Sequence, residues 1–499
     1  MTLPYVAINK KQGSAIAGAT TANKCLVIGP SSAGTQSTEL YTFANTSQIT
    51  TDIGYGNAQE VAQLVLAMAP AGYGSVDVLV APASTAGSIT AVSAASPTIV
   101  PSGTAYTSYD LRAEITVAGV TGSAKFKYSL DGGNTYTGDL QVPLAATYAI
   151  PNTGLTLTFG AGSNVVGNAT TYSIVGPTMT TTDLATCITT LSTSNTNYTC
   201  IIIADDTRLP VAGAALFTAM DSHLTSLNNT YFKPTMAIVN AGGETKLFNR
   251  STAALSVGTY KTNNVLANIT SSAGTIGNFL GAVAEQVNTY LAVPEPGYAR
   301  PRKPFSWLIG SETHAVGDDI SLNIAQFPIR RCETPSYDEF QDGSVYHDER
   351  VMAPRTFRGE SGVSVNQGIL KYNPATASSY NLIAKGRVAN RASEIARAAV
   401  RPFLNSRIDV KTDGTGRISE IDKLFIESTV QKQLEDALLN VTRGDGRPGH
   451  VSGVSFLING ENNIASTGVL QGTLSIVPLG YVTSITIDIY FNDVIVTGV

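Results

Sequence analysis

The chain has 499 residues, of which 43% are hydrophobic and only 14% are charged, and its net charge is −5. This apolar content is enough for a large buried core, and it excludes a low-complexity or fibrous chain. The weak negative charge argues against a nucleic-acid coat or a cationic protein of membrane surfaces. We therefore expect no nucleic acid and no membrane insertion. The first residues also lack the basic and apolar regions of a signal peptide.

The first 22 residues predict an extended N-terminal arm. They are polar and rich in Gly, Ala and Thr, apart from one short apolar run. That run consists of Tyr5, Val6, Ala7 and Ile8. It could form a short strand, but no partner for a hairpin follows it closely in the chain.

Strand and helix patterns then alternate and predict an α/β domain over 23–98 and 177–300. The apolar runs 25–29 and 76–80 are typical of buried strands, and the 3–4 spacing of apolar residues over 58–68 predicts a helix between them. The pattern resumes after residue 176, with two more strands and a helix. These later elements are a strand at 200–204, a helix at 211–227 and a strand at 234–239.

Residues 99–176 interrupt this pattern and predict an inserted all-β domain. Apolar residues alternate with polar ones in several short runs that Gly-rich turns separate. One of these turns, at 129–136, is similar to an Asp-box, with Tyr136 where that motif has Trp. Asp131 and Gly132 suit a tight turn, so a stabilised hairpin is the favoured interpretation and weak glycan binding is the alternative.

A Pro-rich stretch near residue 300 predicts a domain boundary, and charged residues are concentrated beyond it. Two helices are expected there, at about 378–400 and 420–441. On the first helix, four arginines fall opposite the apolar side. They are Arg387, Arg391, Arg397 and Arg401. They could form a solvated face with local ion pairs, or a contact surface for an acidic protein.

The C-terminal residues predict strands. A run at 474–476 and a turn at 478–480 precede a stretch in which apolar and polar residues alternate without interruption. Its apolar members are Ile485, Ile487, Ile489 and Phe491. One face of this strand should therefore be buried and the other polar.

No constellation of residues predicts catalysis, a metal site or a cofactor. The four histidines, His223, His314, His347 and His450, have no ligand or base spacing between them, and we expect His314 and His347 to lie in solvated loops. The four cysteines are scattered and predict reduced, mostly buried thiols. We therefore expect that the protein is not an enzyme.

The order of these parts resembles the tail sheath protein of a contractile bacteriophage. The resemblance covers most of the chain and is clearest at 23–82, 177–300 and 378–499, especially in the run 475–489. It implies an α/β core of mixed sheets with flanking helices, an inserted outer β-domain and extended N- and C-terminal arms. Residues 301–499 would form the sheath core, with the C-terminal arm from about residue 470.

The resemblance also implies a structural function that involves no catalysis. Copies of the chain would form hexameric rings stacked into a helical sheath around a tail tube protein, with baseplate and tail terminator proteins at its ends. The apolar runs of both arms would pair with sheets of neighbouring subunits, and the arginines would contact the tube. The sheath would assemble in the host cytoplasm as part of the virion and contract to drive the tube through the host envelope.

Two other interpretations remain open. The sheath of a phage-like bacterial injection system or bacteriocin would have the same pattern. An extracellular adhesin or surface-layer protein would explain the Thr and Ser content and the β-domain, but it should carry a secretion signal.

Overall fold

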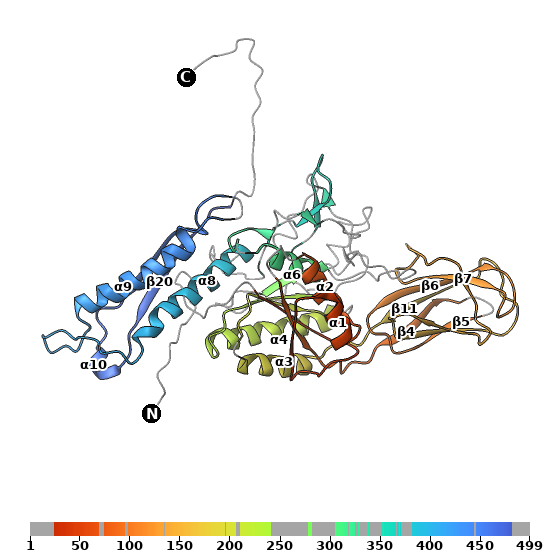
Figure 1. Ribbon diagram of the computed structural model, residues 1–499, viewed down its shortest axis with the longest axis horizontal. Coiled ribbons are helices and arrows are strands. Elements are labelled where there is room, and N and C mark those ends of the chain that lie inside the picture. Colours follow the sequence, from red (N-terminus) through yellow and green to blue (C-terminus); the bar gives the residue numbers. More distant parts are fainter. Residues whose placement is uncertain are drawn as a thin grey trace, which may run out of the picture.

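The computed structural model describes most of the chain between residues 24 and 481 (Figure 1). The described residues are 24–68, 74–94, 98–133, 135–194, 196–205, 210–240, 278–281, 305–317, 319–324, 328–329, 337–338, 352, 354–365, 367–368, 370, 382–443 and 446–481. Both predicted arm strands, Tyr5 to Ile8 and Ile485 to Phe491, lie outside these residues, as does His347.

A six-stranded sheet lies at the centre of the α/β region. Its strand order is β14-β13-β12-β1-β3-β2, and all neighbours are parallel except the edge strand β2, which runs antiparallel to β3. The bounds are β1 Cys25–Gly29, β2 Leu40–Phe43, β3 Val76–Val80, β12 Cys200–Ile203, β13 Met236–Asn240 and β14 Asn278–Gly281. The predicted strands β1 and β3 are confirmed, because continuous apolar runs are typical of a parallel sheet that is buried on both faces.

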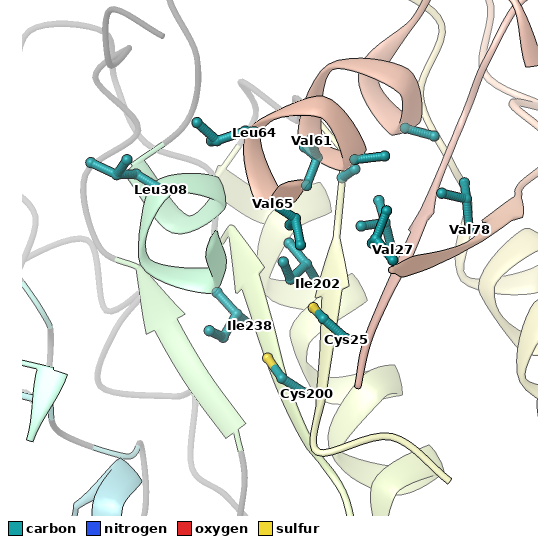
Figure 2. Packing of buried hydrophobic residues seen from close by; sticks show 14 of the residues in the cluster. Cys25, Val27, Val61, Leu64, Val65, Val78, Cys200, Ile202, Ile238 and Leu308 are labelled. Atoms are coloured by element: carbon teal, nitrogen blue, oxygen red, sulfur yellow. The ribbon is translucent and has the colours of Figure 1, made fainter. Parts of the chain in front are cut away.

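Helices cover both faces of this sheet. One face carries α1 (Thr46–Ile53), α2 (Asn57–Met68) and α6 (Phe305–Ala315); the other carries α3 (Thr181–Thr193) and α4 (Pro210–Asn229). Alternate residues of β1, β3, β12 and β13 enter the two cores. In β1, Cys25 and Val27 pack beneath Val61 and Val65 of α2 (Figure 2). Leu26 and Ile28 belong to the opposite core, which α3 and α4 cover.

Two sequence predictions need correction in this region. Helix α6 was not predicted. It packs against α2 and the sheet, and Leu308 lies in the same core as Val65. The core therefore continues across the domain boundary that was expected near residue 300. The prediction that His314 lies in a solvated loop is wrong, because His314 lies on α6 with 3% of its surface exposed.

Residues 88–175 form two antiparallel sheets that enclose a core of their own. Phe126 and Phe159 join the sheets edge to face, with ring centroids 4.8 Å apart. The first sheet has the order β4-β11-β6-β7-β8 and the second β5-β10-β9. The bounds are β4 Ser88–Ser93, β5 Ile99–Gly103, β6 Tyr109–Val117, β7 Lys125–Ser129, β8 Leu140–Gln141, β9 Thr147–Ile150, β10 Leu155–Phe159 and β11 Ala169–Val175. Strand β4 had been assigned to the α/β domain, but it pairs with β11, so the all-β region begins earlier than residue 99.

The C-terminal unit combines two helices with a hairpin. Helix α8 (Ile383–Val400) packs on α9 (Glu420–Leu434), which continues into the π-helical turn η3 (Glu435–Leu439). The hairpin consists of β19 (Val451–Ile458) and β20 (Gly472–Pro478). Shorter elements complete the described chain. They are β15 Pro328–Ile329, β16 Tyr337–Asp338, β17 Pro354–Thr356, β18 Val363–Val365, η2 Arg401–Phe403 and α10 Ile464–Thr467.

Candidate functional site

The two edges of the hairpin β19–β20 differ in their contacts with the rest of the described chain. Side chains of α9 close the β19 edge: Gln431 Nε2 donates to Val454 O (2.8 Å), Phe456 N donates to Gln431 Oε1 (2.9 Å), and Ile458 N donates to Glu427 Oε1 (2.6 Å). Three outward-pointing backbone groups of β19, namely Val454 O, Phe456 N and Ile458 N, are therefore bonded within the chain.

The β20 edge has no partner strand among the residues that the structure describes, and we call it the open edge. Leu474 lies opposite Phe456, and Ile476 lies opposite Val454. Two residues that lie directly opposite each other in an antiparallel pair either both point their backbone groups toward the other strand or both point them away from it. Phe456 N bonds to α9, so Phe456 and its partner Leu474 both point away. Leu474 and Ile476 therefore present their N–H and C=O groups away from β19. Within the described residues, no hydrogen bond reaches these groups.

A buried polar cluster lies where the C-terminal unit meets the segment after α6. The Ser321 hydroxyl donates to Asp319 Oδ1 (2.9 Å) and lies 3.2 Å from His450 Nδ1. The Arg387 guanidinium donates to the backbone oxygens of Asp319 (3.3 Å) and Gly317 (3.2 Å). The Tyr481 hydroxyl donates to Ser321 O (2.7 Å), which fixes the chain immediately before the C-terminal run. This cluster, which we call the joint, ties α8, β19 and the end of β20 to the α/β region.

The joint contains the residue types of a hydrolase triad but not its geometry. Asp319 Oδ1 lies 3.5 Å from His450 Nδ1, the same ring nitrogen that Ser321 approaches. A triad needs the acid and the nucleophile on opposite nitrogens of the ring, so that the base can relay a proton. His450 is 4% exposed, which also closes the site to substrate. Burial of the joint raises the pKa of Tyr481 to about 12.

The structure corrects the predicted four-arginine face of α8. Arg387 is 3% exposed and belongs to the joint, so it points into the protein. Arg397 donates to Phe232 O (3.0 Å) and stacks over the Phe232 ring. Arg391 forms an ion pair with Glu394 (3.1 Å), and Arg401 is exposed. Apolar and small residues of α8 are buried on more than one side of the helix, so Arg387 and Arg397 lie against other parts of the protein and bond to backbone oxygens there.

The pKa of Glu394 on α8 is shifted, and a stability measurement can test this shift. Burial raises its pKa to about 7, against the opposing effect of Arg391. The folded chain then binds this proton more tightly than the unfolded chain, so the contribution of Glu394 to stability is lost as pH rises through the folded pKa. We expect Glu394→Gln to become more stable than the wild type as pH rises from about 4.5 to about 7, by about 3 kcal/mol.

Urea titrations of both chains across this pH range measure the difference. Glu461→Gln is the matched control, because the Glu461 side chain is 72% exposed in its pair with Arg417. Parallel stability curves for Glu394→Gln and the wild type would contradict the assignment.

The Asp-box-like turn is a structural element. Asp131 is 2% exposed and accepts from Ser129 Oγ (2.6 Å), Thr135 N (2.9 Å) and Thr135 Oγ1 (2.6 Å). Gly133 N donates to Ser129 Oγ (2.8 Å), and Gly133 has a φ of 103°, which a residue with a side chain rarely adopts. The polar atoms of the motif therefore bond to one another, as the hairpin interpretation predicted.

Other site predictions concern cysteines, metals and membranes. Cys25, Cys187 and Cys200 are free and buried, as predicted. Among the described residues, no group of three or more His, Cys, Asp or Glu could hold a metal ion. The described helices include none that is both long enough and apolar enough to span a bilayer.

Sequence reasoning missed the joint and the closed edge. Ser321 and His450 are 129 residues apart, and no local pattern links them. The closed edge did leave a signal, because Glu427 and Gln431 of α9 and Glu435 at the start of η3 recur every four residues and so lie on one face.

Comparison with solved structures finds sheath proteins. The chain is similar to the sheath tail protein of Listeria innocua, with 13% identity, a TM-score of 0.40, and 93% of this chain and 97% of that chain covered. It is also similar to the contracted PVC sheath of an extracellular contractile injection system, with 9% identity, a TM-score of 0.48, and 99% and 98% covered. The contracted helical sheath of the anti-feeding prophage gives 9% identity, a TM-score of 0.48, and 99% of both chains covered.

Among curated proteins, the comparison found no match. Residues 3–288 match the family described as DUF2586, N-terminal domain. This match takes in the central sheet and the whole all-β region, and it extends over more than half of the sequence. The chain belongs to the DUF2586 family.

Proposed function

We propose that this chain is the subunit of a contractile tail sheath that polymerises as stacked hexameric rings around a tail tube. The observation that carries the proposal is the open β20 edge, which lies directly before the alternating C-terminal run. An open strand edge is a template for another strand, and proteins normally cover it. In a polymer, a strand from a neighbouring subunit would cover it.

The arm strands are the proposed partners of this edge. Tyr5, Val6, Ala7 and Ile8 form one candidate strand, and Ile485, Ile487, Ile489 and Phe491 line the apolar face of the other. Strand addition would give the backbone groups of Leu474 and Ile476 their hydrogen bonds. Because α9 already closes the β19 edge, we propose that β20 is the edge that accepts an arm.

Contraction would be a change between two packings of the same subunits. No nucleotide is required if the assembled state is metastable and the contracted state is more stable. The joint would keep the C-terminal unit and the α/β region together while subunits move past one another. Baseplate and tail terminator proteins would bind the sheath ends, with assembly in the host cytoplasm. An injection-system or bacteriocin sheath would use the same subunit design.

Two arginines of α8 keep exposed surface that could face the tube: Arg391, whose side chain is 37% exposed in its pair with Glu394, and Arg401. We expect that reversing both to Glu weakens sheath–tube association, and that association of the wild type falls with rising salt, because exposed charges are screened. Co-sedimentation with the tube protein measures this. Unchanged association of the double variant would assign both residues to a solvated face.

Electron microscopy of the purified full-length chain tests the proposed function. Hollow tubes of stacked rings are the expected result. Single particles that remain monomeric at high concentration, with normal circular dichroism, would contradict it. An adhesin would instead be found on the surface of the producing cell, which antibody labelling of intact cells would detect.

A further inference from the structure

Helix α9 has apolar side chains on two sides. The side that packs into the core consists of Ile426, Val430 and Leu434. The first two turns also bear three large apolar residues that are 80%, 61% and 60% exposed, and these are Ile421, Leu424 and Phe425. Their spacing of three and four residues places them together on one face of the helix. Clustered exposed apolar side chains on a folded protein usually mark an interaction surface.

The turn between α8 and α9 extends this surface. Phe403 of η2 meets Phe425 edge to face, with ring centroids 6.0 Å apart. Leu404 follows and is 38% exposed, and the exposed Arg407 lies three residues later. Among the residues that the structure describes, Arg407 has no ion-pair partner. We call Leu404, Arg407, Ile421, Leu424 and Phe425 the α9 patch.

The uncompensated charge at the border of the α9 patch is positive. Both acids in the first turn of α9 are already bonded: Glu420 pairs with Lys411 (2.8 Å) and Lys423 (3.6 Å). Asp422 accepts from a backbone N–H (2.6 Å). Arg401 adds a second exposed guanidinium, again with no ion pair within the described part of the chain. An apolar centre bordered by arginines fits a protein surface that carries carboxylates beside a ring or an aliphatic group.

The same chain has exposed carboxylates that no basic residue accompanies. Residues 25–111 contain no Lys, Arg or His. Within this stretch, Glu39 directly before β2 and Asp52 in the last turn of α1 are exposed. Glu39 accepts from the Tyr41 hydroxyl (3.0 Å), and neither carboxylate forms an ion pair with a described residue.

Glu39 and Asp52 lie at the same edge of the central sheet. Gly34, in the loop after β1, contacts the side chains of Val80 and Ile53, since an added Cβ would lie 3.1 and 3.2 Å from them. Val80 ends β3, beside the start of the antiparallel strand β2, and Asp52 directly precedes Ile53. Both carboxylates therefore lie near this loop. We call Glu39, Tyr41 and Asp52 the acidic edge.

The α9 patch and the acidic edge lie far apart on one chain. Figure 1 shows α9 at one end of the long axis, with α10 beside its start, whereas α1 lies beyond α3 and α4 and close to the all-β region. One chain therefore cannot join its own two surfaces, but two copies can. A contact between two different surfaces leaves one of each kind free, so it can repeat along a row of copies.

We propose that the α9 patch of one copy of the chain binds the acidic edge of a second copy. Arg401 and Arg407 face the carboxylates of Glu39 and Asp52, and the apolar face of α9 covers the ring of Tyr41. Charge favours this pairing over the symmetric ones, because two α9 patches would bring arginines together and two acidic edges would bring carboxylates together. The contact needs neither an arm strand nor a tube, so it does not depend on the proposed function.

Cross-linking between two full-length variants tests this pairing. Both carry Cys332→Ser, and the other three cysteines are buried. The first variant adds Ser428→Cys, on the exposed face of α9, and the second adds Gln48→Cys, one turn before Asp52 on α1. Under mild oxidation, the mixture should form disulfide-linked dimers at least about tenfold faster than either variant alone.

Charge reversal tests the chemistry of the contact. Arg407→Glu in the first variant should slow cross-linking of the mixture about fivefold, and Glu39→Lys with Asp52→Lys in the second variant should restore most of the rate. Arg401 stays unchanged, because the proposed tube contact also uses it. Lys125→Glu is the matched control, since Lys125 is exposed on β7, and it should leave the rate unaltered.

Several outcomes would overturn the proposal, provided that circular dichroism shows folded variants. Equal rates for the mixture and for Ser428→Cys alone would mean that the two surfaces do not pair. Loss of cross-linking in Arg407→Glu without recovery through the two lysines would mean that the acidic edge is not the partner. Without faster cross-linking of the mixture, flotation of the wild type with phosphatidylglycerol vesicles that Ile421→Asp abolishes would make the α9 patch a membrane contact.

Discussion

Replacing Ile487 with Asp should yield folded chains that do not polymerise. In the proposed sheath, Ile487 lies on the apolar face of a strand that a neighbouring subunit buries, and an unpaired buried carboxylate costs several kcal/mol. Because every subunit contact repeats this cost, assembly should be lost and not merely slowed. Size-exclusion chromatography and electron microscopy measure assembly, and circular dichroism measures folding.

Thr486→Asp is the matched control for this experiment. Thr486 is the adjacent residue, and in the proposed strand it would lie on the opposite, polar face. It should assemble like the wild type. Deletion of residues 1–15 should repeat the loss of assembly through the other arm. Normal tubes from Ile487→Asp would show that the C-terminal run is not a subunit joint.

Replacing Arg387 with Met should destabilise the joint by about 3 kcal/mol. The substitution keeps an apolar stem of similar length but leaves the backbone oxygens of Gly317 and Asp319 without the donors that Arg387 supplies. A buried acceptor that loses its partner is a recognised source of large destabilisation. Urea unfolding followed through the single tryptophan, Trp307 on α6, reports on the region beside the joint.

Arg401→Met is the control, since Arg401 is exposed and its loss should change stability by no more than about 0.5 kcal/mol. Similar urea midpoints for the two variants would mean that Arg387 fills space without stabilising the joint.

The sequence predicted the parts of the fold that depend on local pattern. The strands β1 and β3 begin and end where their apolar runs do. Helix α9 begins at Glu420 as expected, with Ser419 Oγ accepting from Asp422 N (3.1 Å). Asp422 does not return a bond to the backbone of Ser419, because its Oδ2 instead accepts from Asp409 N (2.6 Å). A competing backbone donor nearby in space leaves no trace in the local sequence.

The candidate site could be predicted only in part, because its contacts join distant segments. The alternation near the C-terminus predicted strands, but the partner strand β19 and the closure of its edge by α9 depend on how a helix packs on a hairpin. The prediction of a four-arginine face was wrong for a related reason. A helical wheel places Arg387 opposite the apolar side, but α8 is covered on more than one side, so the wheel cannot say which face meets solvent.

The way the chain enters β1 determines how the protein would bear tension. Lys24, the first described residue, pairs with the buried Asp77 (2.6 Å), and Lys24 O accepts from Thr199 N (3.0 Å). Strand β1 follows directly, with parallel neighbours on both sides, β12 and β3. A pull on residues 1–23 along the strand axis therefore loads both hydrogen-bond ladders in shear, so the bonds must break together. Strand β20, at a hairpin edge, can be peeled away one bond at a time, so the N-terminal attachment would be the mechanically stronger of the two.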